Sequence, residues 1–419
     1  MRDIEVVIRG GQPLTGRVSV SGAKNAALPD LAAVVLGSGS FRFENVPLVE
    51  DIRAMVRALH GIGAEGEFAG NTIELYLGEP SSGLVHREIA ETSRASILLL
   101  GPLLARTGYA KVSLPGGCRI GDRKFNYHLQ GLEKMGADIR VDDGHILARA
   151  RRLKGVEYTF PQKTVTGSEN LLMASTLADG ESILTNCAQE PEIADLVIML
   201  KKMGADIEPG SEPGAWRVRG RTSLEGASHR IIPDRIEAGT YLIAGCFRGN
   251  DVIVEGVVPD HVSNLSQTLR TMGVDMERVG GGLRVIPSGR IFGTEIETRP
   301  YPGFPTDLQA QLTTLLTQAE GTSRVTENIF NNRFQHVVEL NRLGARIVVR
   351  GNLAVIEGQT PLRGRSIGAT DLRASAALVL GGLIASGETR IKNAFQLFRG
   401  YEKMPEKLQS LGADIRVDP

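Results

Sequence analysis

Two kinds of hydrophobic pattern alternate along the chain, each at helical spacing. In the first kind apolar residues occupy nearly every face, and a helix of that kind must be buried. These stretches cover residues 26–36, 96–105, 169–178, 236–247, 308–319 and 372–385. In the second kind only one face is apolar, as where Ile52, Met55 and Leu59 alternate with charged residues. The pattern predicts six buried central helices and six outer helices.

A short phrase ends each outer helix and marks an internal repeat. It reads Leu-x-x-(Ile/Met/Leu)-Gly, and its six glycines stand roughly 70 residues apart, a spacing typical of a supersecondary unit of several elements. They are Gly63, Gly136, Gly204, Gly273, Gly344 and Gly412. Glycine at a helix C-terminus adopts the left-handed conformation that ends the helix. Each phrase therefore predicts a helix end followed by a strand, such as residues 138–141.

Short β-branched and alternating runs supply the sheets between these helices. The clearest cover residues 39–43, 110–114, 181–184 and 251–254. Helices and strands in this order predict an α/β fold of two lobes, each built from three repeated units. We place the first lobe at residues 22–231 and the second at 232–419, with the boundary near 228–232. Residues 5–9 and 16–20 read as strands that could pair with either lobe.

Composition narrows the class of protein. The chain has 419 residues, 42% hydrophobic and 23% charged, which is typical of a globular protein. Lysine plus arginine equals aspartate plus glutamate at 48 each, so net charge gives no reason to expect a nucleic-acid or membrane partner. The first residues lack a secretory pattern and the apolar runs are too short to span a bilayer, so we expect a cytoplasmic protein. Three cysteines without Cys-x-x-Cys spacing indicate neither disulfides nor a zinc site.

Polar residues stand where each central helix begins. In a lobe with internal threefold symmetry the three helix N-termini gather at one end, where unpaired amides attract anions. Aspartate and threonine at these junctions can also be read as ordinary N-caps, as for Asp234 or Thr166. Capping does not explain cations at positions that the helix dipole disfavours. These cations are Lys24, Arg94 and Arg373.

A glycine-rich loop at residues 115–121 carries the thiol of Cys118, with Arg119, Arg123 and Lys124 close in sequence. Neighbouring cations favour a thiolate and can hold an anion. Taken alone, such a loop is more often a structural turn that contains a small apolar side chain.

The chain as a whole resembles the enolpyruvyl transferase family, and within it the UDP-N-acetylglucosamine 1-carboxyvinyltransferases. The resemblance runs in order along the whole chain and rests on residues 21–29, 115–118, 233–237, 304–307, 332–334, 370–375 and 399–402. It implies the family's two-lobed inside-out α/β barrel, in which the N-terminal strand completes the second lobe, so that residues 1–21 belong with residues 232–419. It also implies transfer of the enolpyruvyl group of phosphoenolpyruvate to the sugar 3-hydroxyl of UDP-N-acetylglucosamine, the first committed step of peptidoglycan synthesis, without cofactor or metal.

The resemblance assigns roles to individual residues. Cys118 is implied as general acid and as the thiol that fosfomycin alkylates, and Asp307 as the group that takes the proton of the attacking hydroxyl. Phosphoenolpyruvate would be held by Lys24, Arg123 and Arg399, and Asn25 would position the sugar hydroxyl. The remaining implied substrate contacts are Arg94, Lys124, Phe125, Asn126, Tyr127, Lys163, Val165, Thr166, Gly167, Ile329, Arg333, Asp371 and Arg373.

Some positions depart from the family pattern. Residues 124–127 read Lys-Phe-Asn-Tyr where many relatives have a Pro-Val-Asp-Leu-like segment at the uracil. Glu50 replaces a lysine of some relatives, and Phe398 replaces an aspartate before Arg399. A related transferase with another nucleotide acceptor therefore stays open, as does a non-catalytic scaffold. The oligomeric state is open too.

Other candidates are read as structural. Cys187 and Cys246 lie in apolar or ordinary repeat surroundings. His128 and His336 are expected to be hydrogen-bonded helix residues, because no second ligand stands at metal-site spacing.

Overall fold

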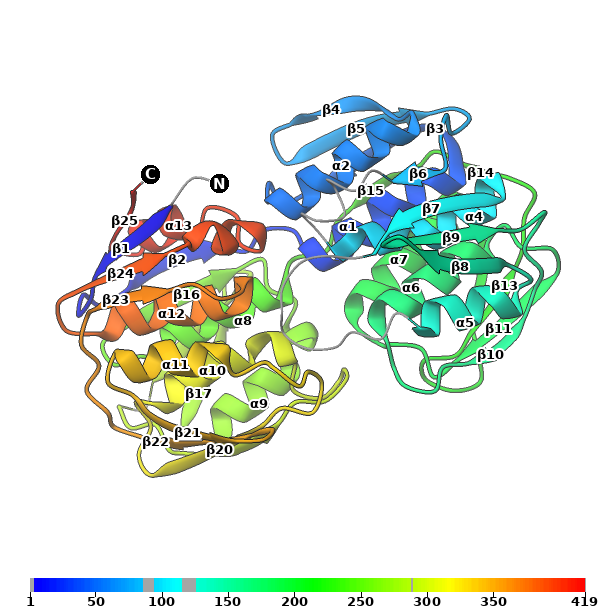
Figure 1. Ribbon diagram of the computed structural model, residues 1–419. Helices are drawn as coiled ribbons and strands as arrows, with labels where there is room; N and C mark the ends of the chain where they lie inside the picture. Colours follow the sequence, from blue (N-terminus) through cyan, green and yellow to red (C-terminus); the bar gives the residue numbers. More distant parts are fainter. Residues whose placement is uncertain (1–3, 86–93, 115–125, 288, 419) are drawn as a thin grey trace. The chain divides into compact units, whose positions relative to one another are not determined.

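The structure, a computed structural model, describes residues 4–85, 94–114, 126–287 and 289–418. Its described residues form two compact units. We call residues 22–114 and 126–232 the first unit, and residues 4–21 and 233–418 the second unit (Figure 1). Each unit has one hydrophobic core of its own. None of the described helices combines the length and apolarity needed to cross a membrane.

Central and outer helices alternate along the first unit, as the two hydrophobic patterns predicted. The central helices are α1 (Lys24–Ala33), α4 (Leu100–Thr107) with the preceding 3₁₀ turn η2 (Arg94–Leu99), and α6 (Val165–Ser175). The outer helices are α2 (Glu50–Ile62), α5 (Asn126–Lys134) and α7 (Pro191–Lys202). Nine of the ten residues of α1 are buried, which explains why its sequence has no polar stripe.

The second unit repeats the plan. Its central helices are α8 (Arg235–Gly245), α10 (Gln309–Leu316) with the turn η4 (Thr306–Leu308), and α12 (Leu372–Ile384). Its outer helices are α9 (Ser263–Thr271), α11 (Gln335–Arg342) and α13 (Met404–Ser410), with the turn η5 (Ala394–Arg399) before α13. All residues of α10 are buried. Helices in the middle and sheets on the outside make each unit an inside-out α/β barrel, as predicted.

Three sheets cover the helices of the first unit. Their strands are β3 (Gly37–Glu44), β4 (Glu65–Ala69), β5 (Thr72–Leu77), β6 (Leu84–Val85), β7 (Tyr109–Ser113), β8 (Asp138–Asp142), β9 (His145–Arg149), β10 (Glu157–Thr159), β11 (Glu181–Thr185), β12 (Asp206–Pro209), β13 (Trp216–Arg219), β14 (Leu224–Glu225) and β15 (Ser228–Arg230). The sheet orders are β6-β7-β9-β8, β10-β11-β13-β12 and β14-β3-β5-β4, with β15 also beside β3. In each sheet the first strand is parallel to the second, and the remaining pairs along the order are antiparallel. Strand β15 is also parallel to β3.

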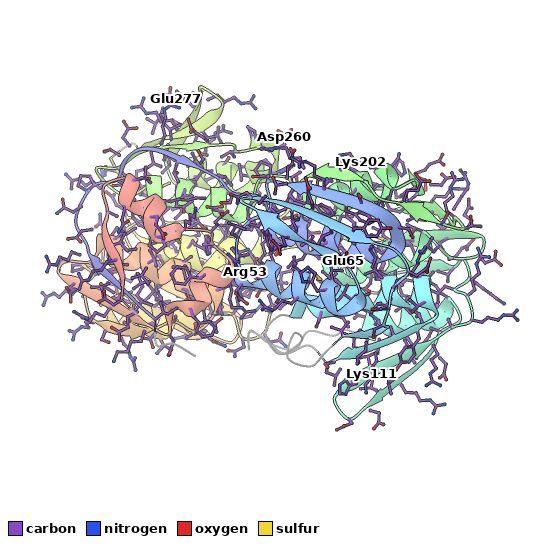
Figure 2. All side chains as sticks on the ribbon, turned by 90° about the horizontal axis from the view of Figure 1, so that it is seen from above. Arg53, Glu65, Lys111, Lys202, Asp260 and Glu277 are labelled. Carbon is purple, nitrogen blue, oxygen red and sulfur yellow. The ribbon has the colours of Figure 1, made fainter. Side chains whose placement is uncertain are left out.

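Three sheets of the same plan cover the second unit. Their strands are β1 (Glu5–Arg9), β2 (Thr15–Ser19), β16 (Asp251–Glu255), β17 (Val274–Val279), β18 (Gly282–Pro287), β19 (Glu295–Glu297), β20 (Thr322–Thr326), β21 (Arg346–Arg350), β22 (Leu353–Glu357), β23 (Ser366–Gly368), β24 (Glu388–Lys392) and β25 (Asp414–Asp418). The orders are β17-β18-β16-β2, β19-β20-β22-β21 and β23-β24-β1-β25. Charged side chains such as Glu277 stand on the outer face of these sheets (Figure 2).

Strands distant in sequence close the sheets of both units. The N-terminal strand β1 lies antiparallel between β24 and β25, and β2 lies parallel to β16. Both N-terminal strands therefore pair within the second unit, which settles the pairing that the residues alone left open. In the first unit the closing strands β14 and β15 come from its last residues.

The six repeated glycines all adopt the predicted left-handed conformation. Their φ angles lie between 86° at Gly273 and 110° at Gly344. After Gly63 the amide of Ala64 donates to the carbonyl of Leu59 at 2.9 Å, closing the outer helix as a Schellman motif does. A side chain other than glycine at these positions would strain the backbone.

Candidate active site

Asp307 holds two arginines at the start of a central helix of the second unit. It lies in η4, directly before α10. Its Oδ1 accepts a hydrogen bond from Nη2 of Arg333 at 2.8 Å, and its Oδ2 accepts one from Nε of Arg373 at 3.1 Å. Because Arg373 is in the first turn of α12, this contact brings the N-termini of α10 and α12 together. The expected gathering of helix N-termini is therefore found for these two helices.

Asp307 differs from the two other junction aspartates of this unit. Asp234 caps α8 by accepting from the amides of residues 236 and 237. Asp371 caps α12 by accepting from the amides of residues 373 and 374. The capping interpretation thus holds for Asp234 and also describes Asp371. Asp307 is not the N-cap residue of its turn, which is Pro305, and its carboxylate accepts hydrogen bonds from two arginine side chains.

The two arginines keep donor groups that no described residue satisfies. Nη1 of Arg333 and both terminal nitrogens of Arg373 are buried without a hydrogen-bond partner. Leaving such groups unpaired costs about 1–3 kcal/mol each, and more when they are charged. An anionic ligand at this place would satisfy them, so the arrangement is that of an anion-binding site.

Arg373 stays charged although it is only 2% exposed. Burial lowers its pKa, but the neighbouring Tyr401, Asp307 and Asp234 outweigh that effect and raise it. Its guanidinium group also lies over the ring of Tyr401, 5.2 Å from the centroid. These contacts offset the unfavourable helix dipole and explain how a cation is held in the first turn of α12.

A buried glutamate, which the sequence did not single out, forms hydrogen bonds that stabilise the loop preceding Arg333. Glu327 is 3% exposed, and its Oε1 accepts from Oγ1 of Thr298 and from the amides of Ile329 and Phe330. Its Oε2 accepts from Oγ1 of Thr306, the residue before Asp307, at 2.9 Å. Glu327 therefore fixes both the loop that contains Ile329 and the turn that contains Asp307.

Arg399 ends η5 in the same unit and is 7% exposed. Its Nη1 donates to Oε1 of Gln396 at 3.0 Å. Phe398, the preceding residue, packs partly buried against the core. Gln396, three residues away, thus supplies an oxygen that orients the arginine.

Lys24 is the first residue of α1 in the first unit. It forms an ion pair with Asp51, a residue that the sequence analysis did not identify. Its Nζ lies 3.2 Å from Oδ2 of Asp51, and both side chains are buried. Asn25, the next residue, is half-buried. Glu50 points to its own helix instead, with Oε1 2.6 Å from Nη2 of Arg57. The departure at Glu50 is therefore accommodated by an exposed ion pair on α2.

The segment from Lys163 to Gly167 leads into α6. Nζ of Lys163 donates to the carbonyl of Cys187 at 3.3 Å. The N-cap is Thr164, whose Oγ1 accepts from the amide of Gly167, so the capping interpretation of Thr166 was wrong by two residues. Thr166 lies inside α6, which begins at Val165, and its hydroxyl meets Nε2 of His128 at 3.2 Å.

Several predicted site residues lie outside the described residues. They are Cys118, Arg123, Lys124 and Phe125, together with the side chain of Arg94. Asn126 is exposed at the start of α5, and Tyr127 is half-buried beside it.

The residues read as structural are buried. Cys187 and Cys246 are both 0% exposed, and burial raises the pKa of Cys187 to about 12 and that of Cys246 further. His128 is hydrogen-bonded to Asn170, as expected. For His336 the expectation was wrong, because neither ring nitrogen has a hydrogen-bond partner among the described residues.

One cluster of the first unit has the donor types of a metal site. Ligand atoms of Asp30, Asp195 and His229 lie within 4.8 Å of one another, and all three residues are buried. However, Nζ of Lys202 lies 3.1 Å from Nδ1 of His229, so that nitrogen accepts and the proton sits on Nε2. Nε2 then donates to Oδ1 of Asp195 at 3.0 Å and is not free to bind a cation. The arrangement favours a hydrogen-bonded cluster over a metal site (Lys202 is labelled in Figure 2).

Comparison with known proteins gives consistent results at the level of sequence family and of fold. The family model described as EPSP synthase (3-phosphoshikimate 1-carboxyvinyltransferase) matches residues 8–408. A protein of Anaeromyxobacter dehalogenans named UDP-N-acetylglucosamine 1-carboxyvinyltransferase is 50% identical over 417 residues, which cover 98% of this chain and 99% of that one. One of the same name from Koribacter versatilis is 50% identical over 414 residues, which cover 98% and 95%.

Among solved structures, the enolpyruvyl transferase NikO from Streptomyces tendae matches with a TM-score of 0.90 and 25% identity, over 100% of both chains. An EPSP synthase from Acinetobacter baumannii has the same fold, with a TM-score of 0.75 over 100% of both chains at 19% identity. On the family match, the full-length relatives and the shared fold, this chain belongs to the EPSP synthase family of 1-carboxyvinyl, or enolpyruvyl, transferases.

Proposed function

We propose that this chain transfers the enolpyruvyl group of phosphoenolpyruvate to the 3-hydroxyl of UDP-N-acetylglucosamine and releases phosphate, in the cytoplasm, as the first committed step of peptidoglycan synthesis. The observation that carries the proposal is the 50% identity over nearly the full length to relatives named for this reaction. The paired arginines at Asp307 support it, because the reaction needs cations that hold phosphate and carboxylate groups.

The chemistry assigns complementary tasks to the proposed residues. The sugar hydroxyl adds to C2 of phosphoenolpyruvate while C3 gains a proton, and the tetrahedral intermediate then loses phosphate and a C3 proton. Cys118 would donate the proton to C3, and Asp307 would accept the proton of the hydroxyl. Both oxygens of Asp307 already accept from arginines, so its orientation is fixed before substrate binds.

The remaining roles are divided between the units. Lys24, Arg123 and Arg399 would hold phosphoenolpyruvate, and Asn25 would position the sugar hydroxyl. Arg333, Asp371 and Arg373 would shape the surroundings of the intermediate, beside Ile329. The nucleotide would be contacted by Arg94, by residues 124–127 and by Lys163 with residues 165–167. No cofactor is needed for these steps.

One assay tests the proposal. Purified protein is mixed with phosphoenolpyruvate and UDP-N-acetylglucosamine, and phosphate release is followed. We expect release that requires both substrates and is lost in Cys118→Ala. Release only with a different nucleotide acceptor would replace the proposal by the related transferase suggested by residues 124–127. Folded protein that releases no phosphate with any acceptor would overturn it in favour of a non-catalytic role.

A further inference from the structure

Lys24 and Asn25 follow directly on a crossing between the two units. Among the described residues, the chain passes from one unit to the other between Ser21 and Gly22 and again between Ile232 and Pro233. Helix α1 begins only three residues after Ser21. Whatever holds Ser21 therefore limits where Lys24 and Asn25 can lie.

Residues 234, 237 and 407 of the second unit form hydrogen bonds with the amide, the carbonyl and the hydroxyl of Ser21. Its amide donates to Oε2 of Glu237 at 2.9 Å, and its carbonyl accepts from the amide of Asp234 at 2.9 Å. Its hydroxyl oxygen accepts from Nζ of Lys407 at 2.7 Å. The same Nζ lies 2.5 Å from Oε1 of Glu237. Glu237 and Lys407 therefore form an ion pair in which Glu237 binds the amide of Ser21 and Lys407 binds its hydroxyl.

The ion pair joins two helices that are far apart in sequence. Glu237 is in the first turn of α8, and Lys407 is in α13. Their side chains are 3% and 20% exposed. Burial raises the pKa of Glu237 to about 6, and the neighbouring Lys407 opposes that rise. Desolvation offsets much of the attraction in a buried pair.

The residues just after Ser21 are held equally closely by the first unit. A side chain at Gly22 would place its Cβ 1.7 Å from the carbonyl oxygen of Asn45, so the backbone runs directly against that residue. The amide of Ala23 donates to the carbonyl of Ile232 at 2.7 Å. Gly22 and Ala23, which lead into α1, are thus held by contacts within the first unit.

We infer that Lys407 and Glu237 are positioning residues for Lys24 and Asn25. They act through Ser21, by fixing the segment from which α1 starts. The kinetic consequence of this inference rests on the proposed function. The structural consequence, a segment 20–23 held by Lys407, does not.

The test compares Lys407→Met with a matched control. Arg17→Met breaks another ion pair of the N-terminal segment within the second unit, where Nη1 of Arg17 in β2 lies 2.7 Å from Oε1 of Glu255 in β16. Arg17 is four residues before Ser21, and its replacement leaves the contacts of Ser21 with Glu237 and Lys407 in place. Amide hydrogen exchange of residues 20–23 and the kinetics with phosphoenolpyruvate are measured on both full-length variants, and Ser21→Ala replaces Lys407→Met if that variant does not fold.

We expect faster exchange at residues 20–23 in Lys407→Met than in the wild type or Arg17→Met. We also expect kcat/KM for phosphoenolpyruvate to fall on the order of tenfold or more, since small misplacements of binding groups have effects of this size. Lys407→Arg, which keeps a cation within reach, should recover most of both.

Unchanged exchange in Lys407→Met, or equal changes in the two methionine variants, would overturn the inference. Faster exchange with unchanged kcat/KM would also overturn it, because the segment would then be held without positioning the site. An inactive wild type would instead refute the proposed function. The exchange measurement would then decide whether Lys407 holds the segment.

Discussion

Nε of Arg373 lies 3.1 Å from Oδ2 of Asp307, although the two residues are 66 positions apart. The contact joins the first turns of two central helices, and a second guanidinium group, that of Arg333, takes the other oxygen. The carboxylate therefore neutralises part of the charge of two buried arginines while their remaining donors stay available for an anion.

Replacing Asp307 by Asn should reduce kcat by at least about 100-fold, the lower range for loss of a general acid or base. The amide is similar in volume but cannot accept a proton at neutral pH. Phosphate release under saturating substrates measures the effect. Asp251→Asn serves as control, because it breaks an exposed aspartate–arginine pair with Arg284 at 2.7 Å and should leave kcat unchanged. Activity of Asp307→Asn within threefold of the wild type would remove the proton-transfer role from Asp307.

The helical architecture could be predicted because its signals are local. The all-round apolar pattern of residues 308–319 identified a buried helix, and the six glycines located the ends of the outer helices. The partners of the site could not be predicted in this way. Asp51 meets Lys24 across 27 positions, and Glu327 meets Thr306 across 21, so their roles depend on tertiary contacts that no periodicity records.

Other features of the structure could not be predicted because they depend on backbone geometry or on strand pairing between distant parts of the chain. The sequence suggested Thr166 as a cap, whereas the backbone geometry shows that Thr164 caps α6. Similarly, the repeat pattern could not assign the N-terminal strands, because strand pairing between β1 and β24 joins opposite ends of the chain.

Asp51→Asn should weaken phosphoenolpyruvate binding through Lys24. The carboxylate lies 3.2 Å from Nζ of Lys24 in a buried setting, and its loss leaves the ammonium group without that charge partner. We expect kcat/KM for phosphoenolpyruvate to fall about tenfold, because charge-assisted hydrogen bonds contribute about 1.5–3 kcal/mol. Glu50→Gln, the neighbouring residue with its exposed pair to Arg57, provides the matched control. Equal kinetics in the two variants would show that Asp51 does not support Lys24.

The native protein should present no more than one reactive thiol. Cys187 and Cys246 are fully buried with raised pKa values, so neither forms a thiolate near neutral pH. A thiol reagent should therefore modify Cys118 alone in folded protein and all three cysteines after denaturation. Cys118→Ser should abolish labelling of the folded form and protect against fosfomycin. Labelling of a second cysteine in folded protein would contradict the burial of the two core thiols.

Asp30→Asn should make the stability of the folded protein depend less on pH than in the wild type, which loses stability as the pH rises. Burial raises the pKa of Asp30 well above its usual value of 3.8, and Asp195 and Glu169 raise it further while Lys202 lowers it. When the pKa of a carboxyl group is higher in the folded than in the unfolded protein, the group adds to the free energy of unfolding at a pH below its unfolded-state pKa. That contribution is lost as the pH rises through the folded-state pKa. Because both its oxygens are buried without a hydrogen-bond partner, a neutral amide suits the position.

Thermal unfolding of Asp30→Asn and the wild type, measured from about pH 5 to pH 9, tests this effect. The midpoint of the wild type should fall more steeply with pH, and each kcal/mol of difference corresponds to roughly 2–4 °C for a unit of this size. Asp275→Asn, at an exposed position of β17, should follow the wild type. Parallel pH profiles for Asp30→Asn and the wild type would mean that Asp30 is ionised in the folded protein. The cluster with Asp195 and His229 would then hold a buried charge in place of a proton.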